Sequence, residues 1–189
     1  MCSALTRLLA ALLLLPASSL AGEILASSIN HEGEDYTLSV TARIDAPLDT
    51  VYRLITDFDN LAAINPAIEE SQLLATLQPD TRRVRSVIKV CILVFCKRVV
   101  QVQDVTLLAG HVIEAVILPE FSDFRSGLAR WQLTARGAAT QLEFSNSFEP
   151  DFWVPPVIGP WLIKRKLVWE VTETAMYIEA KEHDPAQQD

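Results

Sequence analysis

The last quarter of the chain carries the spacing of a long amphipathic helix. The stretch from Trp161 to His183 contains no proline or glycine, and prolines at positions 155, 156 and 160 come just before it. Because proline is tolerated only in the first turn, we expect the helix to begin near Val157 or Trp161 and to run about 33–39 Å. Three- and four-residue steps place these residues on one face: Trp161, Val168, Val171, Ala175 and Ile178.

The middle of the chain alternates between apolar and polar residues, as strands do. Every second residue from Tyr36 to Ile44 is apolar, which predicts a strand over 35–44 with one buried face. Short connections between the later runs favour an antiparallel meander. The six later runs that we expect to form strands are 70–77, 82–91, 96–107, 111–121, 127–135 and 140–148.

Two short helices are predicted between the first and second strands. Asp45 or Ala46 is expected to cap the first helix, with Pro47 at its first position, and the second is expected over 61–68 with a kink or stop at Asn65-Pro66. The whole order predicts an α+β fold in which a seven-stranded, antiparallel, curved sheet wraps around a long C-terminal helix. We expect one domain over 35–183, with a lead-in at 22–34 and a flexible tail at 184–189.

The first residues are typical of a secretory signal. A segment with one positive charge, Met1 to Arg7, precedes the apolar run Leu8–Leu15. Ser19 and Ala21 are the small residues that precede a cleavage site, so we predict a signal peptide over 1–21 that is cleaved after Ala21. An uncleaved anchor is the alternative, but the apolar run is shorter than the roughly 20 residues that span a bilayer. We therefore expect export across the inner membrane, to the periplasm.

Charge and cysteine content narrow the possible partners. The net charge of −8 becomes −9 without residues 1–21, because Arg7 is the only charged residue there. An acidic domain repels phosphate backbones, so nucleic acid is not an expected partner. Cys91 and Cys96 could form a disulfide if the residues between them turn a hairpin. Two free buried thiols, or a metal or redox role, remain alternatives.

Several stretches resemble a known family. They are 44–52, which begins Ile44-Asp45-Ala46-Pro47, Asp57-Phe58-Asp59-Asn60-Leu61 with Asn65-Pro66, then 124–131 and Phe152-Trp153-Val154-Pro155-Pro156. Together they resemble START-like proteins of the polyketide cyclase and coenzyme Q-binding group over about residues 35–180. The resemblance implies a helix-grip fold whose sheet encloses an apolar cavity. It supplies no catalytic residue, because this superfamily includes lipid carriers, hormone receptors, cyclases and stress proteins.

The expected cavity would lie between sheet and helix. Alternation cannot separate cavity walls from packed core, so some of its candidate lining residues could be plain core. The candidates for binding a hydrophobic ligand are Phe58, Ile64, Val84, Ile88, Trp131, Leu133, Phe144, Asn146, Phe148, Trp161, Lys164, Val168 and Val171. Lys164 could reach into the cavity mouth or extend to water.

The segment Phe152–Lys166 combines aromatic residues, prolines and the basic run Lys164-Arg165-Lys166. One interpretation is a cavity rim or an edge that contacts a membrane surface. The other is that the aromatic residues close the end of the core while the basic residues face water.

Catalytic and metal-binding patterns are weak. The three histidines have no metal-ligand spacing, and we expect no metal and no cofactor. The leading hypothesis is an exported protein that binds a hydrophobic or amphipathic molecule such as a lipid, quinone or polyketide-like compound. The alternatives are an enzyme of the cyclase or aromatase type, for which Glu114, Arg125 and Asn146 are the candidates, and a module that docks on a membrane or partner.

Overall fold

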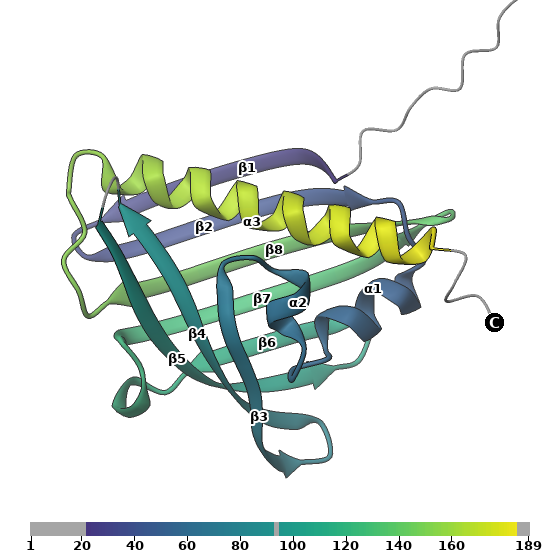
Figure 1. Ribbon diagram of the computed structural model, residues 1–189, viewed down its shortest axis with the longest axis horizontal. Helices are drawn as coiled ribbons and strands as arrows, with labels where there is room; N and C mark the ends of the chain where they lie inside the picture. The colour runs from purple at the N-terminus through teal and green to yellow at the C-terminus, as the bar shows by residue number, and fades with distance from the viewer. Residues whose placement is uncertain (1–21, 93–94, 185–189) are drawn as a thin grey trace, which may run out of the picture.

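The computed structural model describes residues 22–92 and 95–184. The predicted signal peptide at 1–21 and nearly all of the predicted tail at 184–189 lie outside the described residues. Eight antiparallel strands form one curved sheet, in the order β1-β2-β8-β7-β6-β5-β4-β3 (Figure 1). The strands are β1 (Glu23–Glu32), β2 (Asp35–Ile44), β3 (Ile68–Gln78), β4 (Thr81–Ile92), β5 (Phe95–Leu108), β6 (Val112–Ile117), β7 (Phe124–Arg136) and β8 (Ala139–Pro150).

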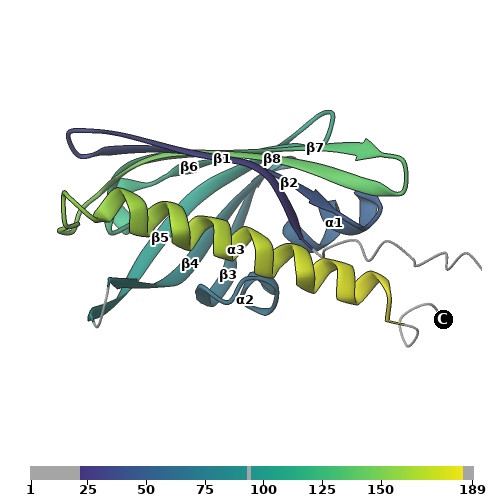
Figure 2. The same ribbon diagram turned by 90° about the horizontal axis from the view of Figure 1, so that it is seen from above.

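Three helices lie on one side of this sheet, as Figure 2 shows. They are α1 (Leu48–Ile55), α2 (Leu61–Ile64) and α3 (Gly159–Glu182). The 24 residues of α3 correspond to about 36 Å, so the helix runs the length of strands β1, β2 and β8. The predicted helix-grip class, the long C-terminal helix and the two short helices are therefore confirmed.

The sheet has one strand more than predicted, because the lead-in at 22–34 forms β1. Gly33 adopts a φ of 65° in the turn to β2, a conformation that glycine allows without strain. β1 pairs with β2 alone and is an edge strand. Its residues are exposed or half-buried throughout, so they lack the clean alternation that identifies a strand with one buried face.

Both ends of β6 differ from the predicted strand at 111–121. β6 begins at Val112, because His111 belongs to the turn and adopts a φ of 58°. The strand ends at Ile117, where Pro119 to Phe121 form a short 3₁₀ turn (η1), since proline cannot donate a hydrogen bond to a ladder. The second short helix ends at Ile64, just before Asn65-Pro66, where the residue that precedes a proline disfavours helix.

The core lies between the concave face of the sheet and the helices. At one end, Ala175 and Ile178 of α3 are fully buried against Val51 of α1 and Ile44 of β2. Phe58 and α2 cover the part of the sheet formed by β4 to β7. At the opposite end, Phe124 packs against Val99 and Ile117. The middle of the molecule, between these clusters, is not completely filled.

Candidate functional site

Two adjoining cavities lie between the sheet and α3. The larger has a volume of about 240 Å³ and lies under α1, α2 and the C-terminal half of α3. The smaller has a volume of about 150 Å³ and lies under the N-terminal half of α3, beside the connection from β8. Five residues line both cavities, and we call this shared boundary the waist: Ile88, Gln101, Asn146, Leu167 and Glu170.

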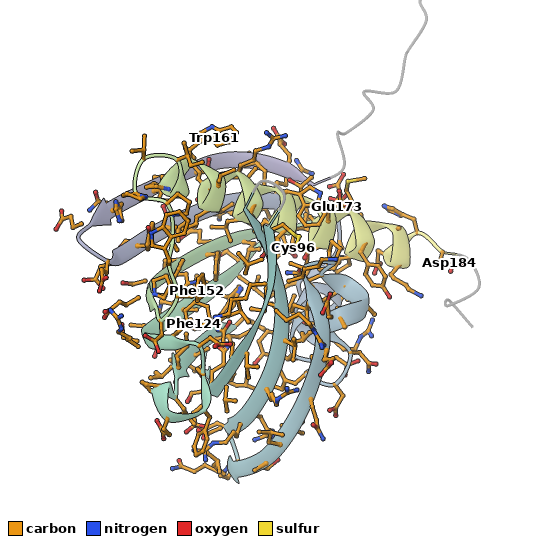
Figure 3. All side chains as sticks on the ribbon, turned by 60° about the vertical axis from the view of Figure 1, so that its left-hand side comes forward. Cys96, Phe124, Phe152, Trp161, Glu173 and Asp184 are labelled. Carbon is orange, nitrogen blue, oxygen red and sulfur yellow. A yellow bond between two sulfur atoms is a disulfide. The ribbon has the colours of Figure 1, made fainter. Side chains whose placement is uncertain are left out.

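Most of the cavity wall is apolar, and strand alternation explains why. Inward positions of β4 and β8, such as Val84 and Phe144, face the larger cavity. Ring contacts extend the wall, since Trp131 and Phe144 lie 5.0 Å apart between ring centroids. Phe124 and Phe152, which line the smaller cavity, lie 5.8 Å apart (Figure 3). Such a wall favours ligands with large apolar surfaces.

Four uncharged polar side chains on the sheet side interrupt this apolar wall. Ser86 of β4 lies opposite Gln101 of β5 in the ladder, and both line the larger cavity. Gln103 lies two residues further along β5, and Asn146 reaches the waist from β8. Among the described residues, no side-chain hydrogen bond satisfies the amides of Gln101 and Asn146. Both residues are half-buried and line the cavities, so these amides are available to a ligand.

One charged pair also lines the cavities. The Lys166 Nζ lies 2.8 Å from Oε1 of Glu170, one turn further along α3. The Glu170 side chain keeps 19% of its surface accessible, and since Glu170 lines both cavities that surface faces their interior rather than bulk water. Burial raises the pKa of the Glu170 carboxyl above its usual value, opposed by the ammonium of Lys166 and by a hydrogen bond with Asn65.

The comparison with family models decides the classification. Residues 36–176 match the family described as polyketide cyclase / dehydrase and lipid transport. The chain belongs to this family. A comparison with the sequences of curated proteins found no match.

Solved structures of START-like proteins share the fold. An aromatase/cyclase from a Streptomyces species, Zhui, is 16% identical, with a TM-score of 0.65 over 82% of this chain and 97% of its own. A START superfamily protein from Mycobacterium smegmatis is 19% identical, with a TM-score of 0.61 over 77% and 96%. A STAR-related lipid transfer protein from Xanthomonas axonopodis is 13% identical, with a TM-score of 0.59 over 84% and 99%. At these identities the likeness shows the fold, which in this family is consistent with binding a hydrophobic ligand or with cyclase activity.

The structure brings most of the predicted ligand-binding residues together. Those that line one or both cavities are Phe58, Ile64, Val84, Ile88, Trp131, Phe144, Asn146, Phe148 and Val171. Four others do not line either cavity. Leu133 is packed into the core with 2% of its surface exposed. The remaining three, Trp161, Lys164 and Val168, lie on other faces of α3.

In the first half of α3, the face that meets the cavities is rotated from the predicted one, whereas Val171, Ala175 and Ile178 face inward as predicted. The cavity is lined by Leu162, Ile163, Lys166, Leu167 and Glu170 in the first half of the helix. Trp161 is 58% exposed and lies at the outer edge of the molecule in Figure 3. The predicted stripe omitted Lys166 and Glu170 because a Lys–Glu pair four residues apart is usually a solvated surface pair.

The waist contains two polar residues that the sequence prediction missed although a signal was present, in addition to the apolar Leu167. Gln101 shares its strand parity with Val99 and Val105, which are both buried, so its amide had to point inward. Glu170 had a weaker signal, namely its position beside Leu167 and Val171 on the helix surface. Gln101 was overlooked because its parity was not compared with that of its buried neighbours, and Glu170 was overlooked because the predicted helix stripe contained apolar residues only.

Two of the predicted catalytic candidates point away from the cavities. Glu114 forms an ion pair with Arg130 on the adjacent strand β7, outside the cavity walls. Arg125 pairs with Glu149, Glu34 and Asp151, and these partners hold its pKa above the usual value. Both residues are thus surface ion-pair members, and only Asn146 among the three candidates lines the cavities.

The end of the molecule around the N-terminus of α3 is apolar and exposed. Trp153 is 76% exposed and Val157 is 89% exposed, and the guanidinium of Arg165 lies over the ring of Trp161. Phe152, in contrast, faces the smaller cavity. The segment Phe152–Lys166 therefore combines both interpretations, since its aromatic residues divide between cavity wall and open surface.

The cysteine pair forms a disulfide. Cys91 and Cys96 lie opposite each other at the β4–β5 hairpin, and their sulfur atoms are bonded. Within residues 22–92 and 95–184, no cluster of His, Cys, Asp and Glu could hold a metal ion. None of the helices described is long and apolar enough to cross a membrane.

Proposed function

We propose that the protein binds an elongated, uncharged amphipathic molecule, of the lipid, quinone or polyketide-like type, across both cavities. The observation that carries this proposal is the waist, where apolar cavities on either side meet at hydrogen-bonding groups. An apolar segment in each cavity would leave water, and the polar group between them would bond to Gln101 and Asn146.

The charge of the site favours an uncharged ligand. Lys166 is the only cation that lines the two cavities among the described residues, and Glu170 already neutralises it. A carboxylate or phosphate of the ligand would enter the cavity without a free counter-charge, which is costly in a medium of low polarity. Amide groups instead suit a ketone, ester or hydroxyl, because they both donate and accept hydrogen bonds.

The cavity volumes set the size of the ligand. At about 30 Å³ per water-sized group, volumes of about 150 Å³ and 240 Å³ accommodate on the order of five and eight such groups. A chain of about a dozen carbon atoms with an oxygen function near its middle therefore fits. Dihexyl ketone has this form, and dodecane and dodecanoate are apolar and anionic counterparts that are one carbon shorter.

The test is displacement of the neutral dye phenylnaphthylamine from delipidated protein. Dihexyl ketone should displace the dye at a concentration about tenfold or more below dodecane and dodecanoate, the effect of a net hydrogen bond of about 1.4 kcal/mol. Replacement of Asn146 by Leu should abolish the preference for the ketone over the alkane. Failure of the dye and of all three compounds to bind would refute the proposal, and tighter binding of dodecanoate would refute its uncharged character.

A cyclase-type reaction is a second candidate, and Glu170 is the observation that favours it. A carboxyl whose pKa is raised by burial can retain a proton closer to neutral pH and donate it to a bound carbonyl oxygen. Cyclisation of a poly-β-keto thioester should then be lost in Glu170→Gln and retained in Glu173→Gln, a control on the same helix outside the cavity walls. Equal turnover in both variants would exclude this role.

We further propose that the protein is exported by the predicted signal at 1–21 and contacts a membrane surface beside the smaller cavity. Trp153 and Val157 would insert at the level of the lipid headgroups, with Arg165 toward phosphate. Sedimentation with vesicles that contain anionic lipid should fall in Trp153→Ala, while displacement of phenylnaphthylamine stays unchanged. Equal sedimentation of Trp153→Ala and the unmodified protein would refute the membrane contact.

A further inference from the structure

A buried carboxylate fastens the last helix to the start of the described chain. Glu179 of α3 is only 6% exposed. The backbone nitrogen of Gly22 lies 3.1 Å from each of its two carboxylate oxygens, and the nitrogen of Asp45 donates to Oε1 at 2.7 Å. Glu179 therefore joins three parts of the fold: α3, the residue before β1, and the turn that follows β2.

This carboxylate lacks a cationic partner. Among the residues that the structure describes, no lysine, arginine or histidine side chain forms an ion pair with Glu179. A buried charge without a counter-charge is costly, and two backbone donors compensate for it only in part. The amide of Gly22 also has a single hydrogen, which must be shared between two oxygens at equal distance.

Gly22 is enclosed at this position. It is buried, and its φ of 65° is one that residues with a side chain rarely adopt. A Cβ atom there would lie 3.0 Å from the carbonyl oxygen of Thr172 and 3.2 Å from the Cβ of Ala175. The geometry thus requires glycine at the residue that follows Ala21, where the small residues Ser19 and Ala21 predict signal cleavage.

We propose that cleavage between Ala21 and Gly22 creates an α-ammonium group at Gly22 that forms a buried ion pair with Glu179. Hydrolysis of this one peptide bond leaves a carboxylate on Ala21 and an amine on Gly22, which takes up a proton at neutral pH. The ammonium has three hydrogens, enough to donate to both oxygens, and it supplies the missing positive charge. Removal of the signal thereby completes the attachment of α3. This inference rests on the proposed export, but not on the identity of the ligand.

The test compares proteins with two different N-terminal residues, each with and without the carboxylate of Glu179. One protein begins at Gly22 and the other begins at Leu20, so that the natural residues Leu20-Ala21 convert the ammonium into an amide. Each is made with Glu179 and with Glu179→Gln. In the Glu179 background, the Gly22 form should melt about 3–6 °C higher, as expected for one or two charge-assisted hydrogen bonds in a domain of this size. In the Glu179→Gln background, this difference should disappear.

A second measurement does not require the Glu179→Gln variant. Cyanate should carbamylate the α-amine of the folded Gly22 protein about tenfold more slowly than that of a free peptide of residues 22–32, because a paired ammonium is rarely deprotonated. Equal rates, or the same melting difference in both backgrounds, would overturn the ion pair. The intact mass of the exported protein should correspond to a chain that starts at Gly22. A different start would overturn the inference but leave export standing, whereas an uncleaved chain would refute export as well. Ligand displacement tests the cavity independently of both.

Discussion

Replacement of Ala129 by leucine tests whether the interior is hollow. Ala129 of β7 lines the larger cavity and is 6% exposed, so the new side chain would point into the space of about 240 Å³. At about 0.8 kcal/mol per buried CH₂, its three additional carbon atoms would add about 2.4 kcal/mol to the free energy of unfolding. The melting temperature should rise by about 5–10 °C.

The same substitution should weaken ligand binding. The leucine takes the place of about three methylene-sized groups of the ligand, which at the same 0.8 kcal/mol each corresponds to about fifty-fold lower affinity. Thermal unfolding and displacement of phenylnaphthylamine by dihexyl ketone would measure the two effects. A gain in stability together with a loss of affinity is the expected signature of a cavity that a ligand fills.

Ala115 provides a matched control. It lies directly opposite Ala129 in the β6–β7 ladder, is 1% exposed and lines neither cavity. Ala115→Leu should therefore overpack the core and cost about 1–3 kcal/mol, with little change in affinity. If Ala129→Leu destabilised the protein by a similar amount, the space beside Ala129 would be solid core, and the reasoning would be wrong.

Three further predictions concern the cysteines, the buried acid and the surface ion pairs. The double variant Cys91→Ser with Cys96→Ser removes the disulfide that closes a loop of sequence separation 5. The free energy of unfolding should therefore fall by about 2 kcal/mol in a denaturant titration. No change would show that the β4–β5 hydrogen bonds alone hold this loop closed. Burial raises the pKa of Glu170, so ionisation destabilises the fold as pH rises from the ordinary value of 4.5 through the higher folded pKa. Glu170→Gln should accordingly match the unmodified protein in stability below pH 4 and exceed it at pH 8, and an equal difference at both pH values would contradict this. Arg125→Ala should leave both the thermal stability and dye displacement nearly unchanged, because all three of its ion pairs are exposed at the surface. A tenfold loss of affinity would contradict this placement.

Most of the fold could be predicted from the alternation of apolar and polar residues along strands that bury one face. β2 shows why: Tyr36, Leu38 and Val40 are buried while the residues between them are exposed or half-buried. β1 could not be found in this way, because an edge strand against the end of a sheet buries neither face fully. β1 forms because it pairs with β2, and this pairing cannot be read from the sequence of residues 22–34 alone.

The candidate site was predictable on the sheet side and less so on the helix side. Strand parity gives each inward residue a definite direction, which is why Val84, Phe144 and Asn146 were placed correctly on the cavity wall. A helix offers no such binary choice, and a stripe of apolar residues fixes its orientation only if the buried face is entirely apolar. In the first half of α3 the inward face includes Lys166 and Glu170, so the apolar stripe predicted the wrong orientation there, although it was right for Ala175 and Ile178 further along.

The position of β2 in the sheet constrains when this protein can fold. β2 pairs with β1 on one side and with β8 on the other, and a hydrogen bond from Thr140 to the carbonyl of Ala46 spans a sequence separation of 94. The β1–β2 hairpin thus joins the rest of the sheet only through β8, the last strand in the sequence, and contacts so distant in sequence form slowly. The sheet therefore cannot close around α3 until the C-terminal part of the chain is available.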